Sequence, residues 1–365
     1  MRSDTGLPLP TNSRMNSGRN IKPSLFSPFE RSPRRVAAPA APSDRAAAEP
    51  GRTPRRPSRR RAWRTPLVTV RPAVLLLAAL FAQPADALEV RYEGTGCPLP
   101  TNVVLIVSRE LARLIQSHQA LFRKAPPKEF RITYHVCRAH AEFARLAEQA
   151  GRATNGLPGF AQATQQRQVE PKPAILRAET RVVTWRQART NDLIAVLLHE
   201  TTHAVTGAFV GRAPLWFLEG SAELLGTPAA SFYKLKRQDE AARWHELEEL
   251  LAKRQLPPLR RFLEADTYAQ WDALFDGDRG RAYTASYSLF HFFIAQPQIS
   301  PFLTSLIDSS VMDQGSGPEQ AFADHVDAHW PGGVTALEKG WHSWIHAKAR
   351  EQRARSKASK PPGPK

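Results

Sequence analysis

Hydrophobic and polar positions follow different periods in the two halves of the region after residue 87. In the first half, short runs alternate apolar with polar residues, which indicates half-buried strands. Between these runs, apolar residues recur every three or four positions, which predicts helices. We expect strands at residues 88–92, 130–136, 173–177 and 181–185, and helices at 103–122, at 141–149 and from 191 through the apolar run 193–198.

After Gly226 the pattern is helical only, with charged amphipathic segments at 233–254, 283–295 and 318–346. A stretch rich in Gly, Gln, Ala and Thr at 151–168 predicts a loop. Strands and helices first, then helices alone, indicate an α+β fold. We expect a small mixed β-sheet subdomain that carries the long apolar helix, followed by a mainly helical subdomain.

The N-terminal region has the pattern of a polar arm followed by a signal peptide. Residues 1–66 are rich in Pro, Arg, Ser and Ala, which predicts disorder. Within 67–87, an apolar run too short to span a bilayer comfortably ends at Ala85-Asp86-Ala87, which predicts a signal peptide cleaved near Ala87. A retained anchor or a buried helix is the alternative, and translation from a later start would leave residues 1–66 unmade. The signal predicts a periplasmic or secreted protein.

The remaining boundaries follow composition. We expect an α+β half at 88–228, a helical half at 229–347 and a basic disordered tail at 348–365. The formal charge of +17 is concentrated at the start, because residues 1–87 hold 16 Lys/Arg and 5 Asp/Glu, a balance of +11 that leaves +6 for the rest. We therefore expect no nucleic-acid partner, and membrane contact only through an uncleaved signal segment. The oligomeric state stays open.

The two cysteines, Cys97 and Cys137, both follow the expected cleavage point. In an oxidising compartment they can form a disulfide that ties two strand regions together. Two buried free thiols are the alternative. Neither cysteine has the spacing of a zinc-binding pair.

The strongest chemical signal lies at the end of the long apolar helix, where residues 199–203 read His-Glu-Thr-Thr-His. His199 and His203 are four positions apart, so both imidazoles project from one helix face and can ligate one zinc ion. Glu200 can act as the general base toward an attacking water. This is the HExxH pattern of metallopeptidases. Two surface histidines beside a solvated glutamate would not be expected directly after the apolar run 193–198.

A catalytic zinc site needs a third protein ligand and one open position. Residues 214–223 read Pro-Leu-Trp-Phe-Leu-Glu-Gly-Ser-Ala-Glu, and Glu219 and Glu223 share one face of the helix they predict. A carboxylate among apolar side chains is costly unless a cation compensates it. We therefore expect Glu219 to be the third ligand and Glu223 to orient a ligand histidine through its other ring nitrogen. The reverse assignment stays open.

These segments resemble the gluzincin zinc metallopeptidases, the clan of thermolysin and aminopeptidase N, and most closely the bacterial peptidase-MA-like domains of unknown function. The resemblance covers about residues 190–295 and implies a zincin-like fold, a Zn²⁺ cofactor and Glu219, in Trp-Phe-Leu-Glu-Gly, as third ligand. It also implies that Tyr283 stabilises the tetrahedral oxyanion, although an ordinary helix aromatic is the alternative. The chain has no GxMEN segment, so aminopeptidase activity is not expected.

The sequence therefore predicts an exported zinc metallopeptidase that acts on a peptide or protein substrate. Strand 181–185, just ahead of the long helix, is expected to pair with an extended peptide. The alternative is a catalytically inactive zincin-fold module for binding or assembly in the cell envelope. The complete set of His199, Glu200, His203 and Glu219 favours the enzyme, because a binding module has no need of the base. Two further histidine pairs, His325/His329 and His342/His346, lack a nearby third ligand and are expected to pack a C-terminal helix.

Overall fold

The computed structural model describes residues 24–25, 88–93, 98–152, 158–168, 174–226, 240–308 and 318–358. All of them belong to one compact unit, which comprises Met1–Ser32 and Asp86–Lys365. The predicted signal peptide, most of the predicted arm, and Cys97 lie outside the described residues. The Cys97–Cys137 disulfide therefore stays a prediction, and Cys137 itself is buried.

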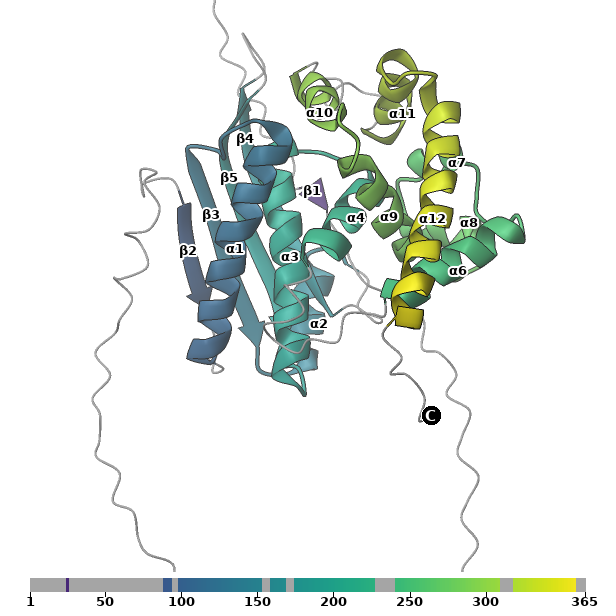
Figure 1. Cartoon of the computed structure of the whole chain (residues 1–365). Coiled ribbons are helices and arrows are strands. Elements are labelled where there is room, and N and C mark those ends of the chain that lie inside the picture. The colour runs from purple at the N-terminus through teal and green to yellow at the C-terminus, as the bar shows by residue number, and fades with distance from the viewer. Residues whose placement is uncertain are drawn as a thin grey trace, which may run out of the picture. The chain divides into compact units, whose positions relative to one another are not determined.

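A mixed sheet forms the first half of the fold (Figure 1). Its strands, in the spatial order β1-β4-β5-β3-β2, are β1 Ser24–Leu25, β2 Leu88–Glu93, β3 Glu129–Cys137, β4 Gly159–Gln168 and β5 Ala174–Trp185. Strands β2, β3 and β5 are parallel, whereas β4 runs antiparallel to β5. Two residues of β1 pair antiparallel with the outer side of β4, at Gln162 and Ala163.

Three expectations about these strands are wrong. The segment expected to be a loop at 151–168 contains β4, which pairs with β5 along its length; its Gln, Ala and Thr residues carry no clear alternation, so the pairing partner decides its conformation. The two strands expected at 173–177 and 181–185 are one continuous strand, β5. Because β5 lies between β3 and β4, its backbone is already paired on both sides and cannot add a peptide strand.

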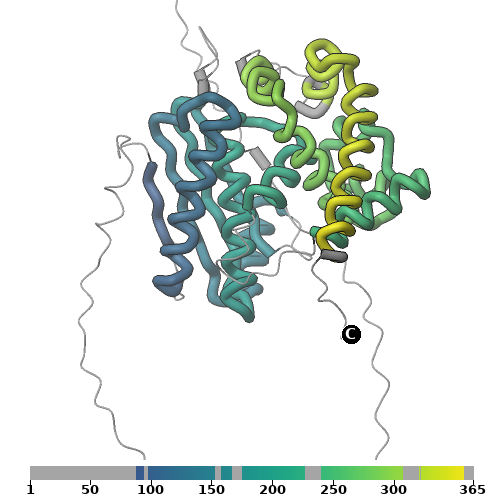
Figure 2. Tube along the Cα trace, viewed as in Figure 1, coloured from purple at the N-terminus to yellow at the C-terminus, as the bar shows by residue number. Residues whose placement is uncertain are grey.

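The helices are arranged around this sheet and in a second half beyond it (Figure 1). They are α1 Thr101–Phe122, α2 His140–Gln149, α3 Thr190–Val210, α4 Leu215–Leu225, α6 Glu240–Ala252, α7 Leu259–Leu263, α8 Tyr268–Leu274, α9 Arg279–Ile294, α10 Ile299–Asp308, α11 Pro318–His329 and α12 Gly333–Ala358. The α+β fold expected from the sequence is confirmed. Figure 2 shows that the halves are consecutive along the chain, blue to teal for the sheet half and green to yellow for the helical half.

The two faces of the sheet carry different helices. Helices α1 and α3 pack together on the face where Val136 of β3 and Val182 of β5 join the main core. The next residue on each strand, Cys137 or Val183, points to the opposite face because side chains alternate along a strand. There Phe143 of α2 completes a smaller core.

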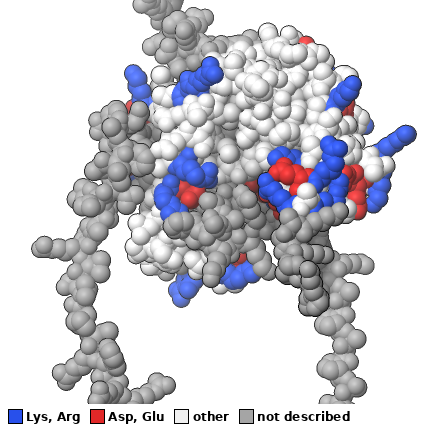
Figure 3. Space-filling view, in the orientation of Figure 1, with Lys and Arg blue, Asp and Glu red and all other residues white. Residues whose placement is uncertain are grey.

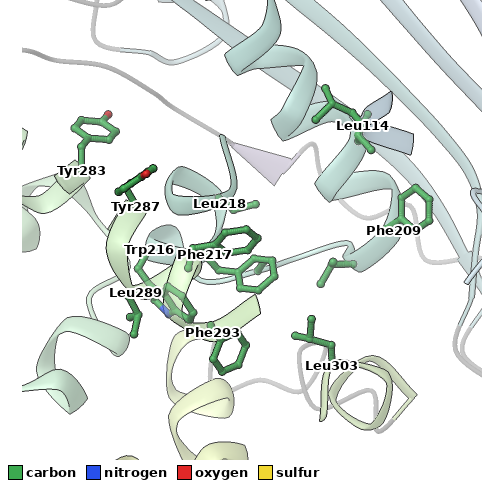
Figure 4. Packing of buried hydrophobic residues seen from close by; sticks show 14 of the residues in the cluster. Leu114, Phe209, Trp216, Phe217, Leu218, Tyr283, Tyr287, Leu289, Phe293 and Leu303 are labelled. Carbon is green, nitrogen blue, oxygen red and sulfur yellow. The ribbon is translucent and has the colours of Figure 1, made fainter. Parts of the chain in front are cut away.

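An aromatic contact joins the two halves. Phe217 of α4 packs edge-on against Phe290 of α9, with ring centroids 5.1 Å apart, and its ring centroid lies 6.4 Å from that of Phe122 of α1. Trp216 is fully buried and meets Phe293 of α9 edge-on at 5.9 Å. Figure 4 shows both aromatic side chains of α4 beside Phe293. Such pairs add about 0.5–1.5 kcal/mol each to the burial of their area, so α4 is held firmly between α3 and α9.

The C-terminal helices differ from the expected boundaries. The segment 318–346 is two helices, because Gly332 and Gly333 have φ angles of 79° and 65°, which break the helix between α11 and α12. Helix α12 then continues to Ala358, through part of the segment expected to be a disordered tail from 348. The ion pair between Arg353 and Glu248 of α6 helps to hold this last part in place. On the face shown in Figure 3, basic and acidic side chains lie next to one another.

Helix α3 is the central helix of the sheet half. It is long and apolar enough to cross a membrane by composition, but 89% of its apolar window is buried inside the protein, as expected for a core helix. Among the described residues it is the only helix of this kind. The Thr201 hydroxyl donates to Leu197 O and also contacts the Tyr134 hydroxyl of β3 at 2.8 Å, which fixes α3 on the sheet.

A buried chain of polar groups links three helices. In α1, His118 Nδ1 lies 2.8 Å from Leu114 O, and its Nε2 lies 2.9 Å from the Thr206 hydroxyl of α3. The Thr206 hydroxyl lies 3.2 Å from that of Ser221 in α4. Burial lowers the pKa of His118 to about 4, so this imidazole is neutral at pH 7.

We predict that this histidine weakens the fold in acid. The unfolded chain takes up a proton at His118 near pH 6.5 and the folded chain only near pH 4, so stability is complete above pH 6.5 and falls between these values. The expected loss is about 3 kcal/mol. Urea unfolding of the wild type and of His118→Gln from pH 7 to pH 4 measures it. The variant should show a shallower decline, and equal slopes would contradict the prediction, because the other histidines titrate in both proteins.

Candidate metal centre

Two helices bring the predicted ligands together. His199 and His203 are one turn apart on α3 and both are buried, with 7% and 1% of their surface exposed. Glu219, 1% exposed, comes from α4, which packs against α3. The close approach of α4 to α9 depends on Gly220, because a Cβ atom there would clash with the backbone oxygen of Ser286 and lie 2.8 Å from Phe290 Cβ.

The three side chains converge through one atom each. His199 Nε2 and His203 Nε2 are 3.1 Å apart, and Glu219 Oε2 lies 3.3 Å from the first and 3.6 Å from the second. Ligands placed 2.0–2.1 Å from a tetrahedral ion are separated by about 3.3–3.4 Å. The buried group His199, His203 and Glu219 therefore has the donor types and the spacing to hold a metal ion.

Some polar atoms of this site have few hydrogen-bond partners within the described part of the chain. His203 Nδ1 is buried and forms no hydrogen bond there, and Glu219 Oε2 has only the two histidine nitrogens near it. Among the described residues, the fully buried Glu200 carboxylate is met only by the backbone at Ala161. In the absence of a cation, burial raises the pKa of Glu200 to about 8. For Glu219, burial acts in the same direction, but His203 and His199 outweigh it and lower the pKa to about 2. A bound cation would compensate both carboxylates, so the site fits a metal.

Glu200 is enclosed between α3 and β4. It follows His199 on α3 and is fully buried. A Cβ atom at Gly159 of β4 would come within 2.8 Å of Val196 and 3.2 Å of Glu200 Cγ, so only glycine lets β4 lie this close. The carboxylate is thus next to the metal ligands and covered by the first residues of β4.

Glu223 lies on the side of His199 that faces away from the ligand atoms. Its Oε1 is 3.7 Å from His199 Nδ1, and its Oε2 forms an ion pair with Arg243 of α6. The Arg243 guanidinium also lies 4.6 Å from the centroid of the Tyr287 ring. The structure therefore places Glu223 beside a ligand histidine, held from the helical half by an arginine that the sequence pattern did not indicate.

A tyrosine that the sequence did not indicate touches the ligand group. The Tyr268 hydroxyl of α8 donates to Glu219 Oε1 at 2.7 Å. Tyr283 of α9, the tyrosine expected to assist the oxyanion, is hydrogen-bonded to Tyr268. Burial, and then the nearby Glu219 carboxylate, raise the pKa of Tyr268, so this hydroxyl keeps its proton. Tyr268 follows a capping box at Thr267 and carries no motif that could have revealed it.

A second group of potential ligands exists elsewhere. His135 and Cys137 of β3 and Glu142 of α2 also place one ligand atom each within 4.8 Å of one another. The Arg181 guanidinium, however, lies 3.1 Å from His135 Nδ1, and burial raises the pKa of the Cys137 thiol to about 11. The positive charge of Arg181 next to His135 disfavours a cation at this second group. The first group is therefore the better candidate for a metal centre.

The remaining histidine pairs form no such group among the described residues. His325 is buried and lies 3.1 Å from the Ser305 hydroxyl, and its ring centroid lies 4.2 Å from that of His329. His346 lies 3.4 Å from Glu248, at the surface between α12 and α6. These contacts are those of packing and surface polar groups.

Comparison with known proteins adds no assignment. No protein-family model matches the chain, and no curated protein matches it significantly. The functional argument therefore depends on the geometry of the site.

We predict that Gly220→Ala displaces α4 and with it Glu219. The added methyl group meets the backbone of α9, and overpacking of this kind costs about 1–3 kcal/mol. Gly280→Ala in α9 is the control, because its Cβ would meet only Asp278 Oδ1, at 3.1 Å, and alanine favours a helix. Thermal unfolding of both variants measures the effect. Equal stability of the two variants would contradict a close α4–α9 contact.

We also predict that His203→Ala abolishes metal binding. One of three ligand atoms is lost from a buried site, so the affinity for a divalent ion should fall by at least about 100-fold. Metal content after dialysis, measured by mass spectrometry, gives the stoichiometry. His329→Ala is the control. It removes an exposed histidine from the pair His325/His329, which has the same spacing of four, and should leave the metal content unchanged. Retention of the wild-type metal content by His203→Ala would exclude the assignment.

Proposed function

We propose that the chain is a zinc-dependent metallopeptidase of the gluzincin type. The observation that carries the proposal is the convergence of His199, His203 and Glu219 next to Glu200, a fully buried carboxylate. Two imidazoles and one carboxylate are ligands that zinc accepts in catalytic sites. The resemblance of HETTH and the Trp-Phe-Leu-Glu-Gly segment to the gluzincins supports the same ligand set.

The residues around the site suit hydrolysis of a peptide bond. Zinc held by the three ligands would supply a Lewis acid next to the scissile carbonyl. Glu200 accepts the proton of the attacking water and passes it to the leaving amine, a role that needs a carboxylate shielded from bulk water. Tyr268 holds Glu219 through its hydroxyl, and Glu223 orients His199. Tyr283, hydrogen-bonded to Tyr268, is proposed to assist the oxyanion.

Strand β4, and not the strand 181–185 expected from the sequence, is proposed to hold an extended peptide. Strand β4 lies at the side of β5 that faces away from β3, and its first residues cover Glu200. Within the described residues, its outer side is paired by β1 only at Gln162 and Ala163, beyond the stretch next to Glu200. An extended substrate is proposed to pair with residues 159–161 of β4.

The protein is proposed to act outside the cytoplasm, as the signal-peptide pattern within 67–87 indicates. Its partners are then peptides or proteins of the periplasm or the medium, and nucleic acid is not proposed. The alternative of an inactive zincin-fold binding module is decided by the same experiment that tests catalysis.

We predict that Glu200→Gln keeps the metal and loses turnover. The amide preserves shape but cannot accept the proton, so hydrolysis of a mixed peptide library should slow by about 10²–10⁴-fold. Mass spectrometry of the products and of the bound metal gives both readouts. Glu249→Gln, at an exposed position on α6, is the control and should match the wild type. Full activity of Glu200→Gln would exclude the mechanism, and a wild type that binds metal without cleaving any peptide would favour the binding module.

A further inference from the structure

A buried arginine stands at the end of α2. Helix α2 ends at Gln149, and Gly151 adopts a φ of +70°, which turns the chain out of the helix. The backbone N–H of Arg152 then donates to Ala147 O at 2.8 Å. The position of Arg152 is thus fixed by the helix end, directly ahead of the segment that leads into β4.

The Arg152 side chain is buried without the partners that a guanidinium requires. Only 8% of its surface is exposed, and its Nε and Nη2 atoms form no hydrogen bond within the described part of the chain. A buried donor without an acceptor costs about 1–3 kcal/mol, and a charged one costs more. A buried group left unpaired in this way calls for an explanation, and a bound ligand that supplies the acceptor is one.

The charge of Arg152 acts on the candidate metal centre. It interacts electrostatically with Glu200, Glu219 and Tyr268. It also contributes to the lowered pKa of His203, after burial and the other charges of the site. The guanidinium therefore lies near the group of residues where a substrate would react.

Arg152 differs from the other arginine at this site. Arg243 forms a direct ion pair with Glu223 and so completes a contact inside the protein. Arg152 is near Glu200 and Glu219 but is hydrogen-bonded to neither. If Arg152 only compensated the negative charge of these two carboxylates, that would explain its positive charge. It would not explain why its Nε and Nη2 donors have no acceptor among the described residues. Two unpaired donors of one guanidinium match the two oxygens of a carboxylate.

We propose that Arg152 is a specificity-determining residue that binds a carboxylate of the substrate next to the metal centre. The carboxylate is either the free C-terminus of a peptide or the side chain of an Asp or Glu residue. This inference rests on the proposed peptidase function for the nature of the ligand. The positive charge would hold the substrate in one orientation and select acidic or carboxyl-terminal segments over neutral ones.

Binding of short peptides to the whole protein tests this proposal. The probes are N-acetylated tripeptides in matched forms: one with a free C-terminal carboxylate, one with a C-terminal amide, and amides that contain Asp or Glu in place of Asn or Gln. Affinities are measured by calorimetry on the zinc-loaded Glu200→Gln variant, so that hydrolysis does not interfere, and again without metal.

We expect at least one carboxylate form to bind about 10- to 100-fold more tightly than its neutral match. Adding Arg152→Gln should remove this preference, and Arg152→Lys should keep part of it, because a lysine retains the charge without the planar pair of donors. Arg145→Gln, at an exposed position on α2, the helix that precedes Arg152, is the control and should keep the full preference. The probe that shows the preference identifies the C-terminus or the acidic side chain as the source.

Equal affinity for carboxylate and neutral probes in the protein with Arg152 intact would overturn the proposal, and this comparison does not depend on the folding of any Arg152 variant. An unchanged preference in folded Arg152→Gln would overturn it as well. The outcome is separable from the proposed function. Hydrolysis by the wild type without carboxylate preference would leave the peptidase standing, whereas carboxylate binding through Arg152 without any hydrolysis would contradict only the peptidase.

Discussion

The placement of negative charge inside an apolar interior is the constraint on which this structure depends. Glu200 and Glu219 are buried beside two imidazoles, and α4 reaches this position with Trp216 and Phe217 packed in the main core. A carboxylate in such surroundings is stable only next to a cation or strong hydrogen-bond donors. Several groups meet that requirement. The imidazole nitrogens lie next to the carboxylate oxygens, the Tyr268 hydroxyl donates to Glu219, and two arginines lie nearby.

The two halves of the fold make different contributions to the site. The sheet half provides α3, with the histidines and Glu200, and β4, whose Gly159 allows a strand to lie directly over Glu200. The helical half provides α9, against which α4 packs. It also provides two polar groups that hold carboxylates, Tyr268 of α8 for Glu219 and Arg243 of α6 for Glu223. The site is therefore complete only when both halves are folded and packed on α4.

The strength of the α4 contacts explains how a site between two halves can keep its spacing. Gly220 lets α4 lie against the backbone of α9, and the aromatic rings of Phe217 and Phe290 pack against each other beside it. On the other side, the hydroxyl contact between Thr206 and Ser221 links α4 to α3. Since Glu219 is next to Gly220 in the chain, these backbone contacts fix where its side chain begins, and the Tyr268 hydroxyl holds its carboxylate.

The sequence by itself determined what is local. The period of apolar positions gave the α+β class, and the spacing of four between His199 and His203 placed both rings on one face, because the helix repeat fixes this wherever the helix lies. Glu219 was accessible to the same reasoning, since a carboxylate among aromatic residues calls for a cation. Only the tertiary structure decided the rest. Strand β4 exists because β5 pairs with it, and Tyr268 and Arg152 reach the site from distant elements without any periodic or motif signal, because contacts between segments far apart leave no mark on either segment alone.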